Sequence, residues 1–186
     1  MSKYYRKINS PYKRDKKGVF IPEFADPVFE EHLDSVWAWT YKWDGTSVGF
    51  EVGGEVFGRT PDSALSWEQW KTVLVWQQYR EGLLENGETY VYGELVGPDV
   101  QRNPHGLDRL AVMQFDSRSE ENYLGLGYQQ DIAYASLREA IDKARTGFLP
   151  DLLPDGDPRY FEGVVGRLVD DPNVITKLKV KDRWSW

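Results

Sequence analysis

Short apolar segments bounded by turn residues dominate the pattern of this chain. The segment Ser35–Tyr41 is apolar and aromatic along its length, which is typical of a buried strand. Gly53-Gly54 marks a hairpin between two of the segments that follow it. The other segments predicted as strands are Thr46–Val52, Glu55–Gly58, Thr89–Val96, Leu110–Phe115, Tyr160–Val169 and Val174–Lys181.

Two segments instead have the apolar spacing of a helix. The first starts at Ser66, with Gln69 as a capping-box partner, and ends at Asn86-Gly87. The second is Tyr134–Thr146, which Gly147 terminates. Many strands and two helices predict an α+β fold with antiparallel sheets. The length of 186 residues, with no linker inside it, predicts a single domain, 1–186.

The composition excludes several classes of protein. The chain has no cysteine, which rules out a disulfide scaffold, a thiolate zinc site and cysteine catalysis. Its two histidines, His32 and His105, are too few for a multi-histidine metal site. No uncharged run approaches the roughly 20 residues that cross a membrane, and the first residues lack the apolar core of a secretory signal. We therefore expect a cytoplasmic protein with no membrane partner.

Positive charge is concentrated at the start of the chain. The net charge is −7, yet residues 1–17 hold seven Lys or Arg and one acid, which leaves −13 for the remainder. A basic N-terminal arm of this kind can follow the phosphates of a nucleic acid. A solvated terminal segment has the same composition, so charge alone leaves both interpretations open.

The clearest candidate for chemistry is the lysine of Lys42-Trp43-Asp44-Gly45, which directly follows the first apolar strand. A lysine at a strand end, before a tight turn, can be held rigidly at the mouth of a pocket. A nucleophilic lysine must lose its proton, and neighbouring cations or partial burial lower the pKa of about 10.4 that a free lysine has. A surface turn with a solvated lysine fits the same four residues.

Side chains inside the other predicted strands add to this candidate. Glu94 and Glu162 lie among apolar neighbours, where a carboxylate is costly unless it is paired, bonded to a ligand or near a metal. The alternation of residues 177–181 puts three lysines on one strand face, either as an anion-binding row or as the solvated face of an edge strand. Phe115 ends another strand, where its ring either stacks on a base or packs in the core.

Together and in this order, these residues resemble the covalent nucleotidyltransferase superfamily, which contains ATP-dependent DNA and RNA ligases and mRNA capping enzymes. Its signature is a K-x-D-G motif, an arginine after the next hairpin, a strand glutamate, an aromatic residue before aspartate, an E-G-x-V strand and a closing K-x-K strand. The resemblance spans roughly Lys42 to Lys181. The matching residues are Lys42–Gly45, Arg59, Glu94, Phe115-Asp116, Glu162–Val165 and Lys179/Lys181.

Within this superfamily the chain is most similar to phage-type RNA ligases. The segments T-Y-K-W-D-G-T-S, F-G-R-T-P-D and G-E-L-V-G-P-D-V-Q-R-N-P resemble segments of those ligases, and Arg6–Asp15 resembles their K-I-P-x-x-x-K-R-D. Tyr41 departs from the pattern, since many relatives have glutamate there. Relatives continue into a further domain beyond the position of Lys181. We therefore expect a lone catalytic domain or a partner protein that supplies the missing domain.

The resemblance implies a fold and a reaction. The fold is an ATP-grasp-like ligase adenylation domain with flanking helices. Lys42 attacks the α-phosphorus of ATP and forms lysyl-AMP, AMP passes to a 5′-phosphate of a nucleic acid, and a 3′-hydroxyl completes the joining. Mg²⁺ or Mn²⁺ and protein cations stabilise the phosphoryl charge. RNA is the expected substrate. The expected location is the cytoplasm, including that of a phage-infected host cell.

The resemblance also implies roles for single residues. Asp44 belongs to the ATP site, Phe115 stacks on adenine, and Glu94 binds ribose hydroxyls. Arg59, Lys179 and Lys181 bind phosphate or ribose oxygens, and Glu162 and Glu94 bind the metal. The residues expected to bind the nucleic acid are Arg6, Lys7, Lys13 and Arg14. A DNA ligase, a GTP-dependent guanylyltransferase and a non-catalytic nucleic-acid-binding domain remain the alternatives.

Overall fold

The computed structural model describes residues 7–51, 56–58, 65–70, 90–114, 123–124, 132–153 and 161–186. The chain forms two compact units. We call Trp43–Gln130, grouped with Met1–Arg6, the central unit, and Lys7–Lys42 with Asp131–Trp186 the terminal unit. The single nucleotidyltransferase domain expected from the sequence stays a prediction.

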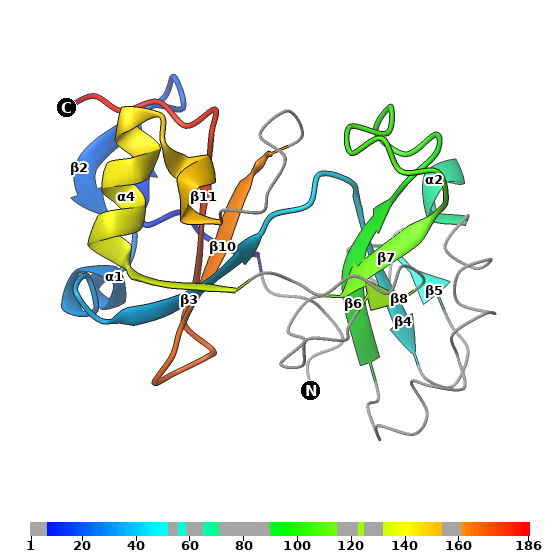
Figure 1. Ribbon diagram of the computed structural model, residues 1–186, viewed down its shortest axis with the longest axis horizontal. Coiled ribbons are helices and arrows are strands. Elements are labelled where there is room, and N and C mark those ends of the chain that lie inside the picture. Colours follow the sequence, from blue (N-terminus) through cyan, green and yellow to red (C-terminus); the bar gives the residue numbers. More distant parts are fainter. Residues whose placement is uncertain are drawn as a thin grey trace. The chain divides into compact units, whose positions relative to one another are not determined.

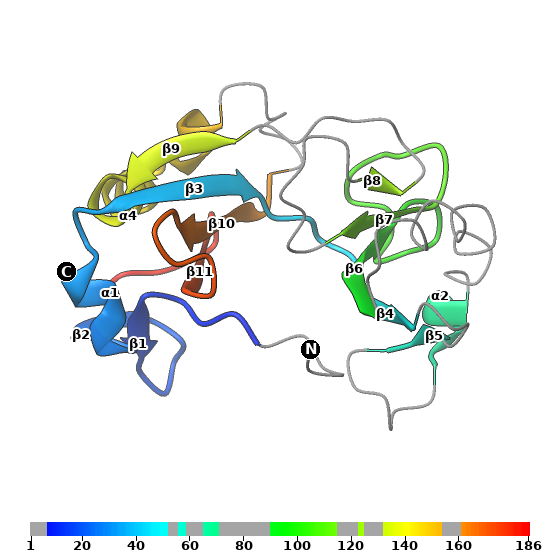
Figure 2. The ribbon, with the colours of Figure 1, turned by 90° about the horizontal axis from the view of Figure 1, so that it is seen from below.

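A four-stranded antiparallel sheet is the frame of the terminal unit (Figure 2). Its strand order is β11-β10-β3-β9, so the early strand β3 lies between two strands that come from the last third of the chain. A second, two-stranded sheet joins β1 and β2. The bounds are β1 Tyr12–Arg14, β2 Phe20–Phe24, β3 Val36–Tyr41, β9 Ala133–Ser136, β10 Gly163–Leu168 and β11 Ile175–Lys179.

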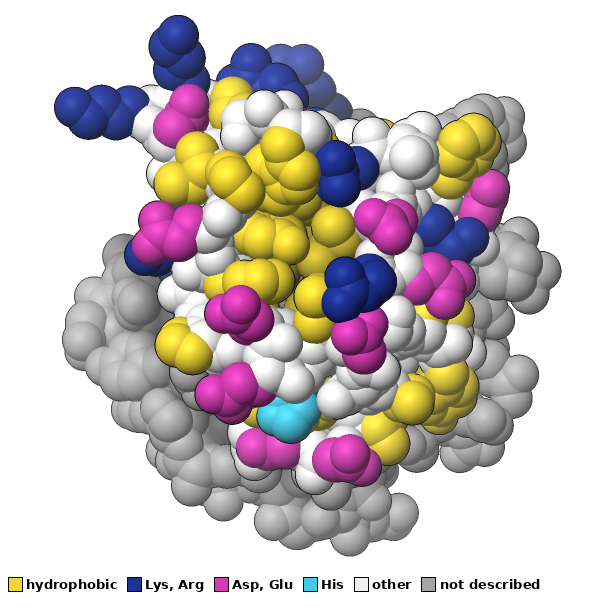
Figure 3. All heavy atoms as spheres, turned by 90° about the vertical axis from the view of Figure 1, so that its left-hand side faces the viewer, with side chains coloured by type: hydrophobic (Ala, Val, Ile, Leu, Met, Phe, Trp, Pro, Cys, Tyr) yellow, Lys and Arg dark blue, Asp and Glu magenta, His cyan; other side chains and the backbone are white. Residues whose placement is uncertain are grey.

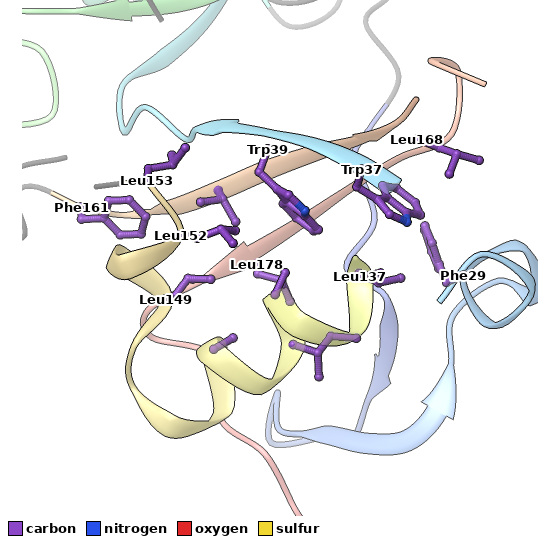
Figure 4. Close-up of a cluster of buried hydrophobic side chains, with 14 residues drawn as sticks. Phe29, Trp37, Trp39, Leu137, Leu149, Leu152, Leu153, Phe161, Leu168 and Leu178 are labelled. Atoms are coloured by element: carbon purple, nitrogen blue, oxygen red, sulfur yellow. The ribbon is translucent and has the colours of Figure 1, made fainter. Parts of the chain in front are cut away.

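One face of the four-stranded sheet carries the hydrophobic core (Figure 4). Trp37 and Trp39 of β3 are fully buried, and they face the apolar side of helix α4, Leu137–Thr146, together with the 3₁₀ helix η1, Leu149–Leu152. Helix α1, Pro27–Glu31, adds Phe29. Fully burying each large apolar side chain contributes about 1.5–3 kcal/mol. The opposite face of the sheet carries the residues that alternate with this core, among them Lys177 and Lys179 of β11.

Helix α4 begins three residues later than the sequence predicts. Ser136 is its N-cap, with the hydroxyl accepting a hydrogen bond from the Glu139 amide at 3.1 Å, and Gly147 ends it with φ 82°. The preceding residues Ala133–Ser136 pair with β3 instead of continuing the helix. The prediction of a helix from Tyr134 is therefore wrong at its start, because strand pairing outweighs the local helical spacing there.

A five-stranded antiparallel sheet is the frame of the central unit, in the order β5-β4-β6-β7-β8 (Figure 1). The sequence predicts four of these strands to within two residues at each end. Of the helix predicted from Ser66, the structure describes only α2, Trp67–Trp70. The strand bounds are β4 Thr46–Glu51, β5 Val56–Phe57, β6 Tyr90–Val96, β7 Ala111–Gln114 and β8 Tyr123–Leu124.

The observed elements confirm the α+β class with antiparallel sheets and few helices. The prediction for the last strand is wrong at its end, because β11 stops at Lys179 and Val180-Lys181 form a turn. Strands β1 and β2 and helix α1 lie in the part of the chain that the sequence shows only as a basic arm and its continuation. Among the described residues, no helix is long and apolar enough to cross a membrane.

Candidate active site

Lys42, Glu162 and Lys179 meet in the terminal unit. The Glu162 carboxylate accepts hydrogen bonds from the Nζ atoms of both lysines, one on each carboxylate oxygen. The side chains of Lys42, Glu162 and Lys179 are 18%, 9% and 22% exposed. These ion pairs are therefore largely removed from water, where charge interactions are stronger than at a solvated surface.

The sheet register brings these three residues together. Lys42 follows β3, and its amide donates to the Gly163 carbonyl at 2.9 Å, which extends the pairing of β3 with β10 by one residue. Gly163 is also the register partner of Lys179 on β11. Glu162 immediately precedes β10, so residues distant in sequence lie on adjacent strands of one sheet.

Glycine is required after Glu162 because the backbone of β11 passes very close to it. A Cβ atom at Gly163 would lie 2.1 Å from the Leu178 carbonyl oxygen, well inside van der Waals contact. The glycine of the E-G-x-V sequence thus permits the close strand approach that places Glu162 beside Lys179.

Lys177 is a further cation on the same strand face. It lies two residues before Lys179 in β11, and successive residues of a strand alternate between faces. Burial, followed by the positive charges of Lys179 and Lys42, lowers the pKa of Lys177 to about 8. Three cations against the single carboxylate of Glu162 make this a site for an anion.

The charge state of Glu162 follows from the same contacts. Burial alone would raise the pKa of this carboxyl group, but hydrogen bonds from Lys179 and Lys42, and their charges, hold it below its ordinary value. Glu162 is therefore ionised at neutral pH. Its charge is paired with two lysines, Lys42 and Lys179.

Lys181 does not share the face of Lys177 and Lys179. The strand ends at Lys179, where the Asp182 carboxylate accepts from the Lys179 amide at 2.8 Å, and Lys181 lies exposed in the turn. Lysine and apolar residues alternate from Lys177 to Lys181, past the end of β11. The sequence pattern therefore does not reveal that the strand ends at Lys179. The geometry favours Lys177 and Lys179 as the K-x-K pair.

In the central unit, the segment after Lys42 is held by Glu94 and His105. The Gly45 amide donates to the Glu94 carboxylate at 3.2 Å, and the Asp44 amide donates to Nε2 of His105 at 2.9 Å. His105 is buried, and its ring centroid lies 4.8 Å from that of Trp43 in an edge-to-face arrangement. Sequence reasoning missed His105, because only the folded loop brings it to this turn.

A divalent metal fits this site only in a limited way. Among the described residues, no group of three or more His, Asp or Glu side chains is arranged to hold a metal ion. Mg²⁺ in nucleotide sites is commonly bound by one or two carboxylates together with substrate phosphates, and Glu162 can be such a carboxylate. A metal on Glu162 would replace one of its lysine contacts.

The remaining residues assigned from the sequence fall into two groups. Arg6, Arg59 and Phe115 lie outside the described residues. Lys7 is exposed, Lys13 pairs with Glu23, and Arg14 pairs with Asp182 at 2.6 Å. The expected nucleic-acid contacts of the arm stay predictions, although the Arg14 guanidinium is already engaged within the protein.

Comparison with known proteins shows what this fold is similar to. No protein-family model and no curated protein matches the chain. The structure is similar to an apo lysine-to-alanine mutant of the RNA ligase from Naegleria gruberi, with a TM-score of 0.54 and 19% identity over 93% of this chain and 60% of that chain. A mutant of the same ligase with ATP and Mn has a TM-score of 0.48 and 18% identity, over 97% of this chain and 63% of that one.

The chain thus spans about three fifths of the length of the ligase structures that it matches. At this level of identity, the likeness concerns the fold. The α+β architecture of this chain is similar to that of the RNA ligase structure from Naegleria gruberi.

Proposed function

We propose that this protein is an ATP-dependent RNA ligase that acts through AMP bound covalently to Lys42. The observation that carries the proposal is the cluster of Lys42, Glu162, Lys177 and Lys179 on one sheet face. It joins a primary amine to an excess of positive charge, which suits an attack on a phosphate. The similarity of the fold to an RNA ligase structure supports the same assignment.

In the first step, the uncharged amine of Lys42 forms a bond to the α-phosphorus of ATP. The bond from that phosphorus to the bridging oxygen of the β-phosphate breaks, pyrophosphate leaves, and the amine proton passes to solvent. The Nζ atom of Lys42 contacts the Glu162 carboxylate, so this contact must separate before the attack.

Lys177 and Lys179 supply the charge that this step requires. Negative charge builds on the phosphoryl oxygens and on the departing pyrophosphate, and fixed cations in a partly buried site stabilise that charge. Mg²⁺ or Mn²⁺ bound beside Glu162 would neutralise phosphate charge further. Arg59, Phe115 and Asp44 keep the roles that the family resemblance gives them as parts of this proposal. Glu94 instead accepts from the Gly45 amide, and Lys181 lies exposed in the turn after β11, so the proposal gives neither a direct role in this step.

The later steps consume a nucleic acid with a 5′-phosphate and a 3′-hydroxyl. AMP passes from Lys42 to the 5′-phosphate, and the 3′-hydroxyl then attacks that phosphorus and expels AMP. RNA is the proposed substrate, because the sequence segments around Lys42, Arg59 and Glu94 resemble RNA ligases and the fold is similar to one.

Labelling with radioactive nucleotide tests the proposal directly. The protein is incubated with α-labelled ATP or GTP and Mg²⁺ and run on a denaturing gel. We expect a labelled band at 21.6 kDa with ATP, none with GTP, and loss of the band in EDTA. A band with GTP alone would identify a guanylyltransferase, and no band with either nucleotide would contradict the proposed chemistry.

An end-joining assay then tests the substrate. Nicked RNA, nicked DNA and single-stranded RNA, each with a 5′-phosphate, are compared in parallel. Joining of an RNA substrate supports the proposal, whereas joining of DNA alone would make the protein a DNA ligase.

A further inference from the structure

The basic arm lies against the strand that carries Lys177 and Lys179. Asn9 forms a parallel bridge with Thr176 of β11, and its carbonyl accepts from the Thr176 hydroxyl at 3.1 Å and from the Lys177 amide at 3.3 Å. The outer edge of β11 is therefore paired at this point. The arm from Asn9 onward belongs to the folded terminal unit.

Arg14 has several contacts inside the terminal unit. Its guanidinium donates to the Asp182 carboxylate at 2.6 Å and to the Gly18 carbonyl at 2.8 Å. The same group lies 3.8 Å above the ring centroid of Phe20, which is fully buried. A planar group with five donors can satisfy two acceptors and an aromatic face at once, which a lysine cannot.

Asp182 connects Arg14 to the lysine strand. Its side chain is only 3% exposed, and its second carboxylate oxygen accepts from the Lys179 amide at 2.8 Å. The Asp182 amide in turn donates to the Lys179 carbonyl at 3.0 Å, which closes the turn. Asp182 thus fixes both the amide and the carbonyl of Lys179, and Arg14 balances its buried charge.

We propose that Arg14 is a positioning residue for nucleotidyl transfer: through Asp182 it fixes the end of β11 and keeps Lys177 and Lys179 on the sheet face that bears Lys42 and Glu162. This inference rests on the proposed function for its catalytic consequence. It also changes the role of one cation, since the sequence assigns Arg14 to the grip on the nucleic acid.

A buried carboxylate that loses its cation is strongly unfavourable, so the turn should rearrange when Arg14 is removed. A rearranged turn releases the Lys179 amide and lets the two lysines move relative to Glu162. Small displacements of groups that stabilise a transition state cost up to about a hundredfold in rate. The loss should therefore be measurable in the first chemical step.

The experiment compares Arg14→Met, Asp182→Asn and Lys16→Met for the rate of labelling by ATP with no nucleic acid present. We expect labelling to slow by about tenfold or more in the first two variants and by less than about twofold in Lys16→Met. Lys16 is an exposed cation of the same arm, so its substitution removes the same charge without touching the turn.

Asp182→Asn separates positioning from a direct role of Arg14 in binding a phosphate. The variant removes the ion pair but keeps every cation and leaves an amide oxygen near the Lys179 amide. Positioning predicts the same loss as in Arg14→Met, whereas a phosphate-binding Arg14 would be left intact or freed. Labelling of Asp182→Asn at the parent rate would overturn the inference, as would an equal loss in Lys16→Met.

Hydrogen exchange at the Lys179 amide keeps the inference testable even if the parent protein takes no label. Positioning predicts exchange at least about tenfold faster in Arg14→Met and Asp182→Asn than in the parent or Lys16→Met, while circular dichroism shows all four folded. Unchanged exchange would overturn the inference by itself. Absence of label in the parent would contradict only the proposed function.

Discussion

The two units hold the K-x-D-G segment with different chemistry. In the terminal unit, Glu162 contacts the charged ends of two side chains, Lys42 and Lys179. In the central unit, Glu94 and His105 accept hydrogen bonds from backbone amides of Gly45 and Asp44. A carboxylate bound to mobile ammonium groups can exchange them for a ligand, whereas an acceptor bound to backbone fixes the course of the chain.

This difference separates residues whose loss should affect the reaction from residues whose loss should affect the fold. The terminal cluster has an excess of positive charge, which an incoming phosphate would satisfy. The central contacts join side-chain acceptors to backbone amides of the protein itself. The predictions below test this division, from the largest expected effect to the smallest.

Replacement of Lys42 should have the largest effect. In Lys42→Ala we expect no covalent label from ATP, because the other amine that contacts Glu162, that of Lys179, lies on β11 and not at the K-x-D-G position of the proposed nucleophile. Lys42→Arg should fail equally, since a guanidinium stays protonated and is not a nucleophile. Denaturing gels measure the label and circular dichroism checks the fold. A labelled Lys42→Ala protein would show that another residue is the nucleophile.

Glu162 and Glu94 form the matched test of the comparison. We expect Glu162→Gln to slow labelling by more than about tenfold, about 1.4 kcal/mol of transition-state stabilisation. Glu94→Ala should instead lower the free energy of unfolding by about 1.5–3 kcal/mol, because the Gly45 amide loses a charged acceptor. Labelling rates and urea unfolding of both variants provide the measurements.

The opposite pattern would contradict the division between the two units. A stable, fully folded Glu94→Ala protein with no labelling would place Glu94 among the groups that act on the nucleotide, as the family resemblance implies. Parent rates in Glu162→Gln would remove Glu162 from the reaction.

Lys177 and Lys181 are both lysines and lie four positions apart in the sequence. A variant at either position is therefore a matched control for the same substitution at the other. We expect Lys177→Met to slow labelling by about tenfold and Lys181→Met by less than about twofold, because only Lys177 lies on the strand face with Lys179. The same labelling assay decides between them. Equal losses would restore the K-x-K assignment of the sequence, with Lys181 as its second lysine.

The pH dependence of pyrophosphate affinity gives a further test of Lys177. Its pKa of about 8 means that the side chain is a cation below this pH and neutral above it. Affinity for pyrophosphate should therefore fall as the pH rises through about 8. In Lys177→Arg the fall should be absent from this range, since arginine stays protonated. Titration calorimetry measures the affinity of both proteins for pyrophosphate at pH values below and above the pKa of Lys177.

The exposed cations of the arm should have the smallest effect. On the face of the terminal unit in Figure 3, Lys and Arg side chains gather at the upper edge. We expect Lys13→Ala with Lys17→Ala to weaken RNA binding and to flatten its salt dependence by about 0.7 per cation on single strands. Labelling by ATP should not change. An unaltered affinity and slope would identify these lysines as a solvated surface.

The sequence predicted the elements that rest on continuous apolar runs. Trp37 and Trp39 mark β3, and the valines after Gly163 mark β10, because a buried strand needs apolar residues throughout. Strand β1 escaped prediction because two of its three residues are basic. Its pairing with β2 is stabilised by aromatic contacts such as that of Tyr12 with Phe24, whose ring centroids are 4.5 Å apart.

The site was predicted less completely, since it depends on register and long-range contact. The motifs identified Lys42, Glu162 and Lys179 as neighbours in function, and the structure brings these three together. The end of β11 depends on Asp182 and Arg14, which are 168 positions apart. No local pattern in the sequence reveals such a contact, so Lys181 was placed in the strand.

The strand order of the terminal unit also has a consequence for the time at which the site can form. Strand β3 leaves the ribosome about a hundred residues before its neighbours β9 and β10. Lys42 can pair with Glu162 only after a further 120 residues have been synthesised. The central unit closes through β4, β6 and β7, which are much nearer in sequence. Domains fold as their chain becomes available, and distant contacts form slowly. During synthesis, Lys42 therefore emerges 120 residues before Glu162, the carboxylate with which it pairs.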